Sequence, residues 1–160
     1  MTTTGRVIDS HNRYFEDLQV GDRIISAART ITESDLVWFS GLSGDCHPLH
    51  TDEVFAQTGP FGARVAHGCL TLSIATGLEF RMMGPGESRI LASYGMDRVR
   101  FVKPVFIGDT IHLECEIVER QDKDENRGVV AQQQEIKNQH GDTVVVLIKR
   151  LLYKKRPSDA

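Results

Sequence analysis

The residues best suited to chemistry lie in one short stretch, SGDCHPLHTD, at positions 43–52. It holds a carboxylate at Asp45, imidazoles at His47 and His50, and a thiol at Cys46. Such groups serve in metal centres, in nucleophilic thiol sites and in pairs that move protons. They also occur in ordinary polar turns, in which an aspartate caps the chain and the histidines have no chemical role.

Metal binding and thiol chemistry are the less favoured of these possibilities. A zinc site usually combines two ligand clusters. The second cluster would be His67 with Cys69, an unusual pattern beside a first cluster stiffened by Pro48. A nucleophilic Cys46 is disfavoured because closeness in sequence does not supply the geometry of a thiolate–imidazole pair. We therefore expect no metal.

Asp45 and His50 are the candidates for a proton-transferring pair. Pro48 fixes its own φ and pushes His47 toward an extended conformation, and Leu49 is suited to act as a buried anchor. A carboxylate and an imidazole held in this way can bind one water, take a proton from it and deliver a proton to another atom. Which of the two is acid and which is base stays open, because both pKa values depend on burial.

A second motif, VAHGCLTLSIATG, begins at Val65 and contains the predicted start of a helix at Gly68. Free N–H groups and the positive end of the dipole lie at a helix N-terminus, so a carbonyl oxygen placed there would be stabilised as an oxyanion. A tight turn into the helix would explain Gly68 equally simply. We expect His67 to order this loop by hydrogen bonding and to take no direct part in chemistry.

Hydrophobic periodicity predicts the elements that must position these groups. We expect one strand at 20–31 and then a helix capped by Thr32 and Asp35 and ended by Gly41 and Gly44, followed by an irregular segment at 43–52 and a short helical piece at 53–57. A buried helix at 68–84 is apolar nearly all round and is ended by Gly84-Pro85-Gly86. Four strands are predicted after it, at 88–105, 109–122, 127–139 and 142–155. This order predicts an α+β fold with a sheet wrapped against a helix. We divide the chain into a loose arm (1–13), one domain (14–155) and a tail (156–160).

Composition limits the classes of function. The 160 residues are 40% hydrophobic and 26% charged, with a net charge of −3, which is typical of one soluble domain. No basic surplus favours nucleic acid, no apolar run is long enough for a bilayer, and the N-terminus does not read as a secretory signal. Three cysteines argue against a disulfide framework and for a cytoplasmic protein, in which each cysteine is a small buried residue.

The segments SGDCHPLHTDEVFA, FGARVAHGCLTLSIATGL and RFVKPVFIGDTI strongly resemble the MaoC-like or (R)-specific enoyl-CoA hydratases. The resemblance implies a single hot-dog fold, in which a curved antiparallel sheet wraps a long central helix and dimers join edge to edge. By this likeness Asp45 and His50 match the catalytic dyad and Gly68 matches the N–H that binds the thioester oxygen. Thr76 matches a position where a relative has serine. His47 departs from the usual asparagine.

The resemblance implies reversible hydration of trans-2-enoyl-CoA thioesters without metal or redox cofactor, the coenzyme A being part of the substrate. We expect short, branched or dicarboxylic acyl groups and a homodimer or higher homo-oligomer. Candidates for binding the coenzyme A phosphates are Arg64, Arg98, Arg100 and Lys103. Two alternatives remain open: a hot-dog thioesterase, whose helix carboxylate would have to be Glu79, and a non-catalytic domain that binds acyl thioesters.

Overall fold

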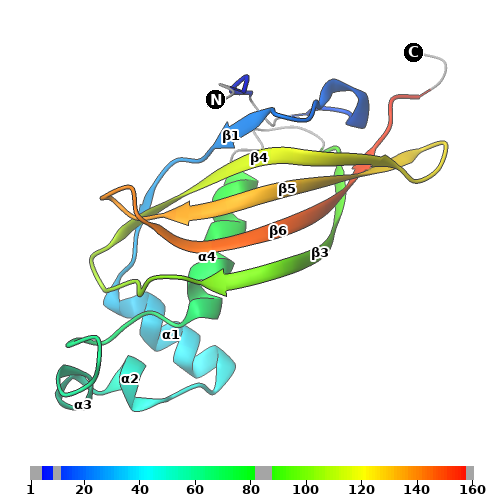
Figure 1. The fold of residues 1–160 in the computed structure, drawn as a ribbon. Coiled ribbons are helices and arrows are strands. Elements are labelled where there is room, and N and C mark those ends of the chain that lie inside the picture. Colours follow the sequence, from blue (N-terminus) through cyan, green and yellow to red (C-terminus); the bar gives the residue numbers. More distant parts are fainter. Residues whose placement is uncertain (1–4, 9–11, 82–87, 158–160) are drawn as a thin grey trace.

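A computed structural model describes residues 5–8, 12–81 and 88–157 of the chain (Figure 1). Its elements, in order, are η1 (Phe15–Asp17), β1 (Arg23–Ile25), β2 (Arg29–Thr30), α1 (Glu33–Ser43), α2 (Pro48–Thr51), α3 (Glu53–Gln57), α4 (Gly68–Arg81), β3 (Ile90–Phe101), β4 (Thr110–Asp122), β5 (Arg127–Lys137) and β6 (Thr143–Lys154). The predicted end of the central helix at Gly84-Pro85-Gly86 lies outside the described residues.

The strands form one curved antiparallel sheet in the order β1-β4-β5-β6-β3, with β2 also paired to β4. The predicted hairpins between β4, β5 and β6 are confirmed. The single strand predicted at 20–31 is wrong, because the ladder is interrupted there. Ile25 pairs with Glu114 and Arg29 pairs with Ile111, so one extra residue of the first segment has no partner on β4.

Helix α1 begins and ends where the sequence predicts. The Thr32 backbone N–H and hydroxyl both donate to a carboxylate oxygen of Asp35 at 2.8 Å, and the Asp35 N–H lies 3.1 Å from the Thr32 carbonyl. Gly44 ends the helix with φ 77°, a left-handed conformation that is easiest for glycine. The chain therefore leaves α1 in a sharp turn immediately before Asp45.

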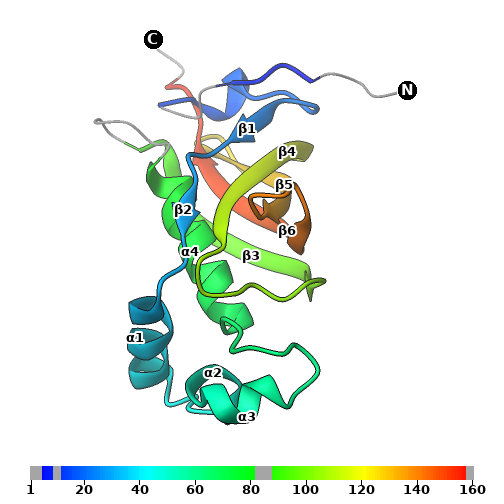
Figure 2. The ribbon, with the colours of Figure 1, turned by 90° about the vertical axis from the view of Figure 1, so that its left-hand side faces the viewer.

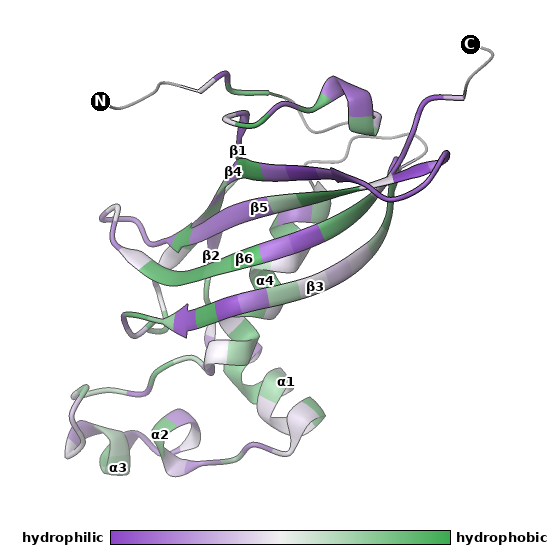
Figure 3. Ribbon diagram, turned by 45° about the vertical axis from the view of Figure 1, so that its right-hand side comes forward, coloured by the Kyte–Doolittle hydropathy of each residue, from purple (hydrophilic) through white to green (hydrophobic). Residues whose placement is uncertain are grey.

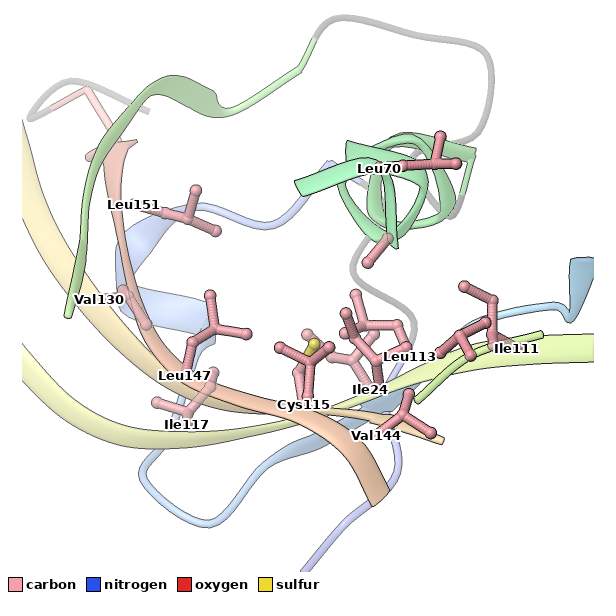
Figure 4. Packing of buried hydrophobic residues seen from close by; sticks show 14 of the residues in the cluster. Ile24, Leu70, Ile111, Leu113, Cys115, Ile117, Val130, Val144, Leu147 and Leu151 are labelled. Atoms are coloured by element: carbon pink, nitrogen blue, oxygen red, sulfur yellow. The ribbon is translucent and has the colours of Figure 1, made fainter. Parts of the chain in front are cut away.

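Helix α4 lies against the concave face of the sheet (Figures 1 and 2). Figure 4 shows Leu70 of α4 above side chains of β4 and β6, among them Leu113 and Leu147, and these three are at most 6% exposed. The expectation that α4 is apolar and buried nearly all round is wrong. Only the side that faces the sheet is covered, so Phe80 is half exposed, and Glu79, a charged residue, is buried there.

Helices α1, α2 and α3 project beyond the end of the sheet at which α4 begins (Figure 2). At the other end of the sheet, η1 contacts β5, and the ring of Phe15 covers Gly128 so closely that a Cβ there would lie 2.4 Å from it. Part of the predicted loose arm is attached: the Ile8 N–H donates to the Arg23 carbonyl at 2.8 Å, and Arg6 pairs with Asp22. In the described residues, no helix has the length and apolarity that crossing a membrane requires.

Candidate active site

The loop after α1 is shaped by a one-turn helix, α2, in place of the irregular segment expected from sequence. Nδ1 of His47 accepts the Leu49 N–H at 3.1 Å, so His47 is the N-cap, and Pro48 occupies the first helical position. Proline is favoured at the first position of a helix, and a residue whose side chain can accept a hydrogen bond is favoured as the N-cap. The sequence therefore contained a signal for the start of this helix. The turn directs His50 back toward the strand-like segment at Val65.

His50 has a defined tautomer. Its Nδ1 lies 2.7 Å from the Val65 carbonyl oxygen, which can only accept, so Nδ1 carries the hydrogen. The neutral ring therefore has its lone pair on Nε2. The ring is partly buried, whereas Asp45 is exposed and its Oδ1 accepts the His47 N–H at 3.3 Å. His50 can thus accept a proton at Nε2 while its other nitrogen fixes the ring.

Asp45, His50 and His67 form one cluster. Each offers a nitrogen or carboxylate oxygen, and these three atoms lie within 4.8 Å of one another. Two hydrogen bonds of ~2.8 Å that meet at one water span about 4.5 Å, so a single water can bridge donor atoms at such a separation. The cluster is therefore of a size to hold one water between a carboxylate and an imidazole.

A divalent metal is the other species such a cluster could bind. Zinc bonds of ~2.0–2.1 Å at tetrahedral angles would place the donor atoms about 3.4 Å apart. Nε2 of His67 is not available without rearrangement, because it lies 3.0 Å from the Asp45 carbonyl oxygen and so donates to it, and Nδ1 is buried. The donor set fits proton transfer better than metal binding, and the absence of a metal remains a prediction.

The ring of His67 is only 3% exposed. It stacks on His50, with ring centroids 3.8 Å apart and planes inclined by 28°, and it contacts the ring of Phe39. Its Nε2 also lies 3.4 Å from the Ser40 hydroxyl. Burial is the main cause that lowers the pKa of His67, with a further contribution from His50, while the hydrogen bond to the Asp45 carbonyl opposes the shift.

Gly68 is the first residue of α4, where backbone N–H groups have no acceptor within the helix. A Cβ on this residue would lie 2.7 Å from the ring of Phe101, so any other residue here would have to displace that ring. Glycine thus allows the close approach of the aromatic ring. The result is an N-terminus with its N–H groups uncovered by a side chain of its own.

All these groups face one cavity of about 530 Å³. Asp45, His50, His67 and Gly68 line it together with mainly apolar residues, namely Phe39, Leu49, Phe61, Val65, Ala66, Phe101, Val102, Pro104, Val105 and Val145. A cavity with apolar walls and a few convergent polar groups is typical of a small-molecule site. Ser43, Cys69, Thr71 and Lys103 complete its lining.

The other predicted supporting residue on α4, Thr76, lies away from the cavity wall. Its hydroxyl donates to the Leu72 carbonyl one turn earlier, at 3.1 Å. Cys46 and Cys69 are exposed, so the expectation that each cysteine is buried holds only for Cys115, where burial raises the pKa of the thiol. Cys69 nevertheless lines the cavity.

The four basic residues predicted to bind phosphate differ in their surroundings. Arg64 pairs with both Glu33 and Glu53, which raises its pKa and ties α1 to α3. Arg98 and Arg100 are exposed on β3. Lys103 alone among them lines the cavity, with its ammonium 2.6 Å from a carboxylate oxygen of Asp142. A role in binding coenzyme A stays a prediction for all four.

Three contributors to the site were not anticipated from sequence. They are the Val65 carbonyl, which fixes the His50 tautomer, the Ser40 hydroxyl and the ring of Phe101. Val65 and Ser40 lie within five residues of predicted site residues, whereas Phe101 comes from a distant part of the chain, and no residue spacing in the sequence marks any of the three.

Comparison with known proteins identifies the family. The sequence model described as "MaoC like domain" matches residues 18–139. The chain belongs to this MaoC-like family. It is 44% identical over 99 residues to a Rhodospirillum rubrum protein named (R)-specific enoyl-CoA hydratase, an alignment that covers 61% of this chain and 65% of that one. The chain spans 31–65% of the length of the first curated relatives it matches.

Solved structures agree on the fold. A "monoamine oxidase regulatory protein" from Archaeoglobus fulgius superposes with a TM-score of 0.86 at 42% identity, covering 94% of this chain and 100% of that one. A Mycobacterium tuberculosis protein with a double hotdog fold superposes with a TM-score of 0.79 at 17% identity, covering 95% and 47% of the two chains. The MaoC-like chain described here has a hot-dog fold, as the sequence predicted.

Proposed function

We propose that this chain is a hydro-lyase that reversibly hydrates trans-2-enoyl-CoA thioesters. One observation carries the proposal: the side chains of Asp45 and His50 offer atoms within 4.8 Å of each other on the wall of the cavity that Gly68 also lines. A water-binding pair and an oxyanion-stabilising helix N-terminus are the two devices that hydration of an enoyl thioester requires. Membership in a family with a named enoyl-CoA hydratase supports the assignment.

In the proposed mechanism the thioester oxygen accepts a hydrogen bond from the Gly68 N–H. A water bound between the dyad side chains gives one proton to His50 Nε2, the lone-pair nitrogen, while the Asp45 carboxylate accepts a hydrogen bond from the O–H that remains and orients the water. The hydroxyl adds to Cβ, and the electrons of the double bond move onto the thioester oxygen. Protonated His50 then returns its proton to Cα, so that one water is added and the dyad is restored.

The acyl chain is proposed to be short, or branched. The cavity of about 530 Å³ must hold the acyl group and the start of the thioester, and it is walled by bulky side chains such as Phe39, Phe61 and Phe101. The coenzyme A part of the substrate would extend out of the cavity past Lys103, the basic residue that lines it. Dicarboxylic acyl groups belong to the same proposal, and a panel of enoyl-CoA substrates tests them directly.

A thioesterase remains the alternative enzyme, and the position of Glu79 weighs against it. Glu79 is 6% exposed, forms an ion pair with Lys149 and is not among the residues that line the cavity. A carboxylate that is sealed and paired cannot attack a thioester or activate a water in that cavity. Asp45 and His50, in contrast, both line the cavity.

We also propose a homodimer in a reducing, cytoplasmic setting. Strand β3 is the edge of the sheet, with β6 as its partner among the described strands (Figure 3). It carries exposed Leu91, Tyr94 and Met96, and a long apolar edge favours pairing with a second strand. Light scattering after size-exclusion chromatography should give at least twice the chain mass of 17.9 kDa, and a monomer would contradict the dimer.

The test of function is a substrate panel. The protein is incubated with crotonyl-CoA and with branched and dicarboxylic enoyl-CoAs, while loss of the conjugated thioester and release of free thiol are followed separately. Loss of conjugation without thiol release supports the hydratase. Thiol release alone would establish the thioesterase, and binding of the thioesters without either reaction would establish the non-catalytic domain.

A further inference from the structure

His67 makes contact with both members of the dyad. Its imidazole lies face to face with His50 at a centroid distance of 3.8 Å, and its Nε2 lies 3.0 Å from the backbone oxygen of Asp45. The two contacts use different parts of the residue: the ring face for His50 and the ring edge for Asp45. One buried side chain is thus in a position to fix the distance between the two groups.

The contact with Asp45 acts on the loop backbone. The side chain of Asp45 is exposed, and its other hydrogen bonds are short-range, from the His47 N–H at 3.3 Å and between its own N–H and the Ser43 hydroxyl at 3.2 Å. The bond from His67 is the one that ties this loop to α4, 22 residues away. Without it, the position of the Asp45 carboxylate would depend on local turn contacts alone.

The contact with His50 acts on the ring. The Val65 carbonyl holds Nδ1 but leaves the ring free to swing about that single bond. A parallel neighbour at stacking distance removes this freedom, because the planes are inclined by only 28°. The direction of the Nε2 lone pair, toward the bridging water, is then set by two constraints of independent origin.

His67 is suited to this work only while it is neutral. Its Nε2–H donates to the Asp45 carbonyl, so protonation would have to occur at Nδ1, which is buried and has no hydrogen-bond partner among the described residues. A buried cation with an unsatisfied N–H, stacked on a second imidazole, is strongly disfavoured. His67 is therefore held in its neutral form.

We infer that His67 is the positioning residue of the site: its neutral ring is the platform for His50, and its Nε2–H anchors Asp45. The inference rests on the proposed function for its kinetic consequences, but the two contacts themselves are properties of the free protein. It assigns His67 no proton transfer to or from substrate. Phe39 and Ser40, which touch the same ring, hold the platform in turn.

Three substitutions separate the two contacts. His67→Gln keeps an N–H donor near the Nε2 position and loses the ring, His67→Phe keeps a ring and loses the donor, and His67→Ala loses both. His140→Gln is the matched control, because it makes the same chemical change at an exposed histidine far along the chain. Thermal unfolding of each variant establishes that it is folded before rates are compared.

We expect kcat to fall about 100-fold in His67→Ala with KM changed by less than about threefold, because misplacement by ~1 Å costs on this order. His67→Gln and His67→Phe should each recover part of this loss, and His140→Gln should match the parent. The pH dependence of kcat should be the same in His67→Gln as in the parent. Equal rates in all four variants, or a changed pH dependence in His67→Gln, would overturn the inference.

Imidazole nitrogen NMR of the free protein tests the same claim without substrate. We expect His67 to remain the neutral Nε2–H tautomer from pH 5.5 to 8, and the Asp45 amide signal to move in His67→Phe but not in His140→Gln. Protonation of His67 near pH 6.5, or an unmoved Asp45 signal, would refute the positioning role. If no enoyl thioester is hydrated at all, the proposed function fails, and this measurement still decides the role of His67.

Discussion

An acid–base cluster lies near each end of α4, and the two clusters differ in burial and in how completely they are paired. Near the C-terminal end, Glu79 binds Lys149 and also accepts from Gln134 Nε2 at 3.1 Å. Gln134 donates in turn to Gln132 at 3.0 Å, and all four residues are at most 6% exposed. Figure 3 shows the corresponding hydrophilic stretch in the middle of the otherwise hydrophobic β6.

At the N-terminal end the pairing is incomplete. His50 Nε2 and the N–H of Gly68 have no protein partner among the described residues, and both residues line the cavity. Burial of polar groups therefore does not by itself identify a functional site. Chemistry requires groups that are fixed at one atom and free at another, and only the N-terminal cluster meets that condition.

Removal of the dyad should give the largest change in activity. We expect Asp45→Asn and His50→Ala each to lower the rate of hydration about 10³-fold, because each removes a group that handles the reacting water. Asp45 is exposed and His50, in α2, is only partly buried, so the melting temperature should hardly change. Steady-state rates with crotonyl-CoA and thermal unfolding measure the two quantities, and a variant with near-normal turnover would exclude its residue from the dyad.

The opposite pattern is expected at the C-terminal cluster. Glu79→Ala leaves the Lys149 ammonium buried without its partner, which should lower the free energy of unfolding by about 3–5 kcal/mol while activity per folded molecule stays the same. The double variant Glu79→Gln with Lys149→Met, which removes both charges, should recover much of that loss. Urea titrations measure the stability. Loss of activity in a Glu79→Gln variant that is still stably folded would instead support the thioesterase mechanism.

Gly68 tests whether close approach at the helix N-terminus matters. In Gly68→Ala the new Cβ must displace the ring of Phe101, and we expect the rate to fall about tenfold as the N–H groups shift away from the thioester oxygen. Phe101→Ala removes the clashing ring, so the double variant should recover activity relative to Gly68→Ala. Kinetic comparison of the two single variants with the double variant checks this, and additive losses would contradict the steric explanation.

The lowered pKa of His67 predicts a specific loss of stability in acid. His67 stays neutral in the folded protein, whereas the unfolded chain takes up a proton near pH 6.5. Its contribution is therefore fully present above pH 6.5 and is lost as the pH falls toward the lowered folded value, by at most about 1.4 kcal/mol per pH unit. The free energy of unfolding, measured by urea titrations from pH 5 to 8, should depend less steeply on pH in His67→Gln than in His140→Gln. An identical pH dependence in the two variants would argue against a buried neutral ring.

How far the sequence predicts this molecule depends on the range of the interaction. Capping of α1 by Thr32 and Asp35 and the hairpins of the sheet follow from local patterns and are confirmed. The stacking of His67 on His50 joins residues 17 positions apart through loop geometry that no periodicity encodes. The interrupted ladder after Ile25 depends likewise on one unpaired residue, which alternation alone does not reveal.

The Glu79–Lys149 pair lies between these cases. Strand alternation places Lys149 on the same face of β6 as Leu147 and Leu151, so the sequence indicates that Lys149 is buried and needs a buried partner. The sequence does not identify that partner, because Glu79 lies 70 residues earlier in the chain and its position depends on the rotation of α4 against the sheet. Tertiary packing decides such pairs, and the sequence shows only that one must exist.

His47 gives the smallest predicted effect and bears on the one departure from the family's usual asparagine. It caps α2 by accepting the Leu49 N–H at 3.1 Å, a task that asparagine performs equally well. We expect His47→Asn to keep turnover within about twofold, and His47→Ala to lose about 1 kcal/mol of stability as the cap is removed. The centre of its ring lies 6.3 Å from that of the His50 ring, and its contact with Asp45 is made by the backbone N–H, which asparagine also provides. A large change of substrate preference in His47→Asn would instead mean that this histidine reads the substrate, because loss of a cap alters the anchoring of the loop without distinguishing one acyl group from another.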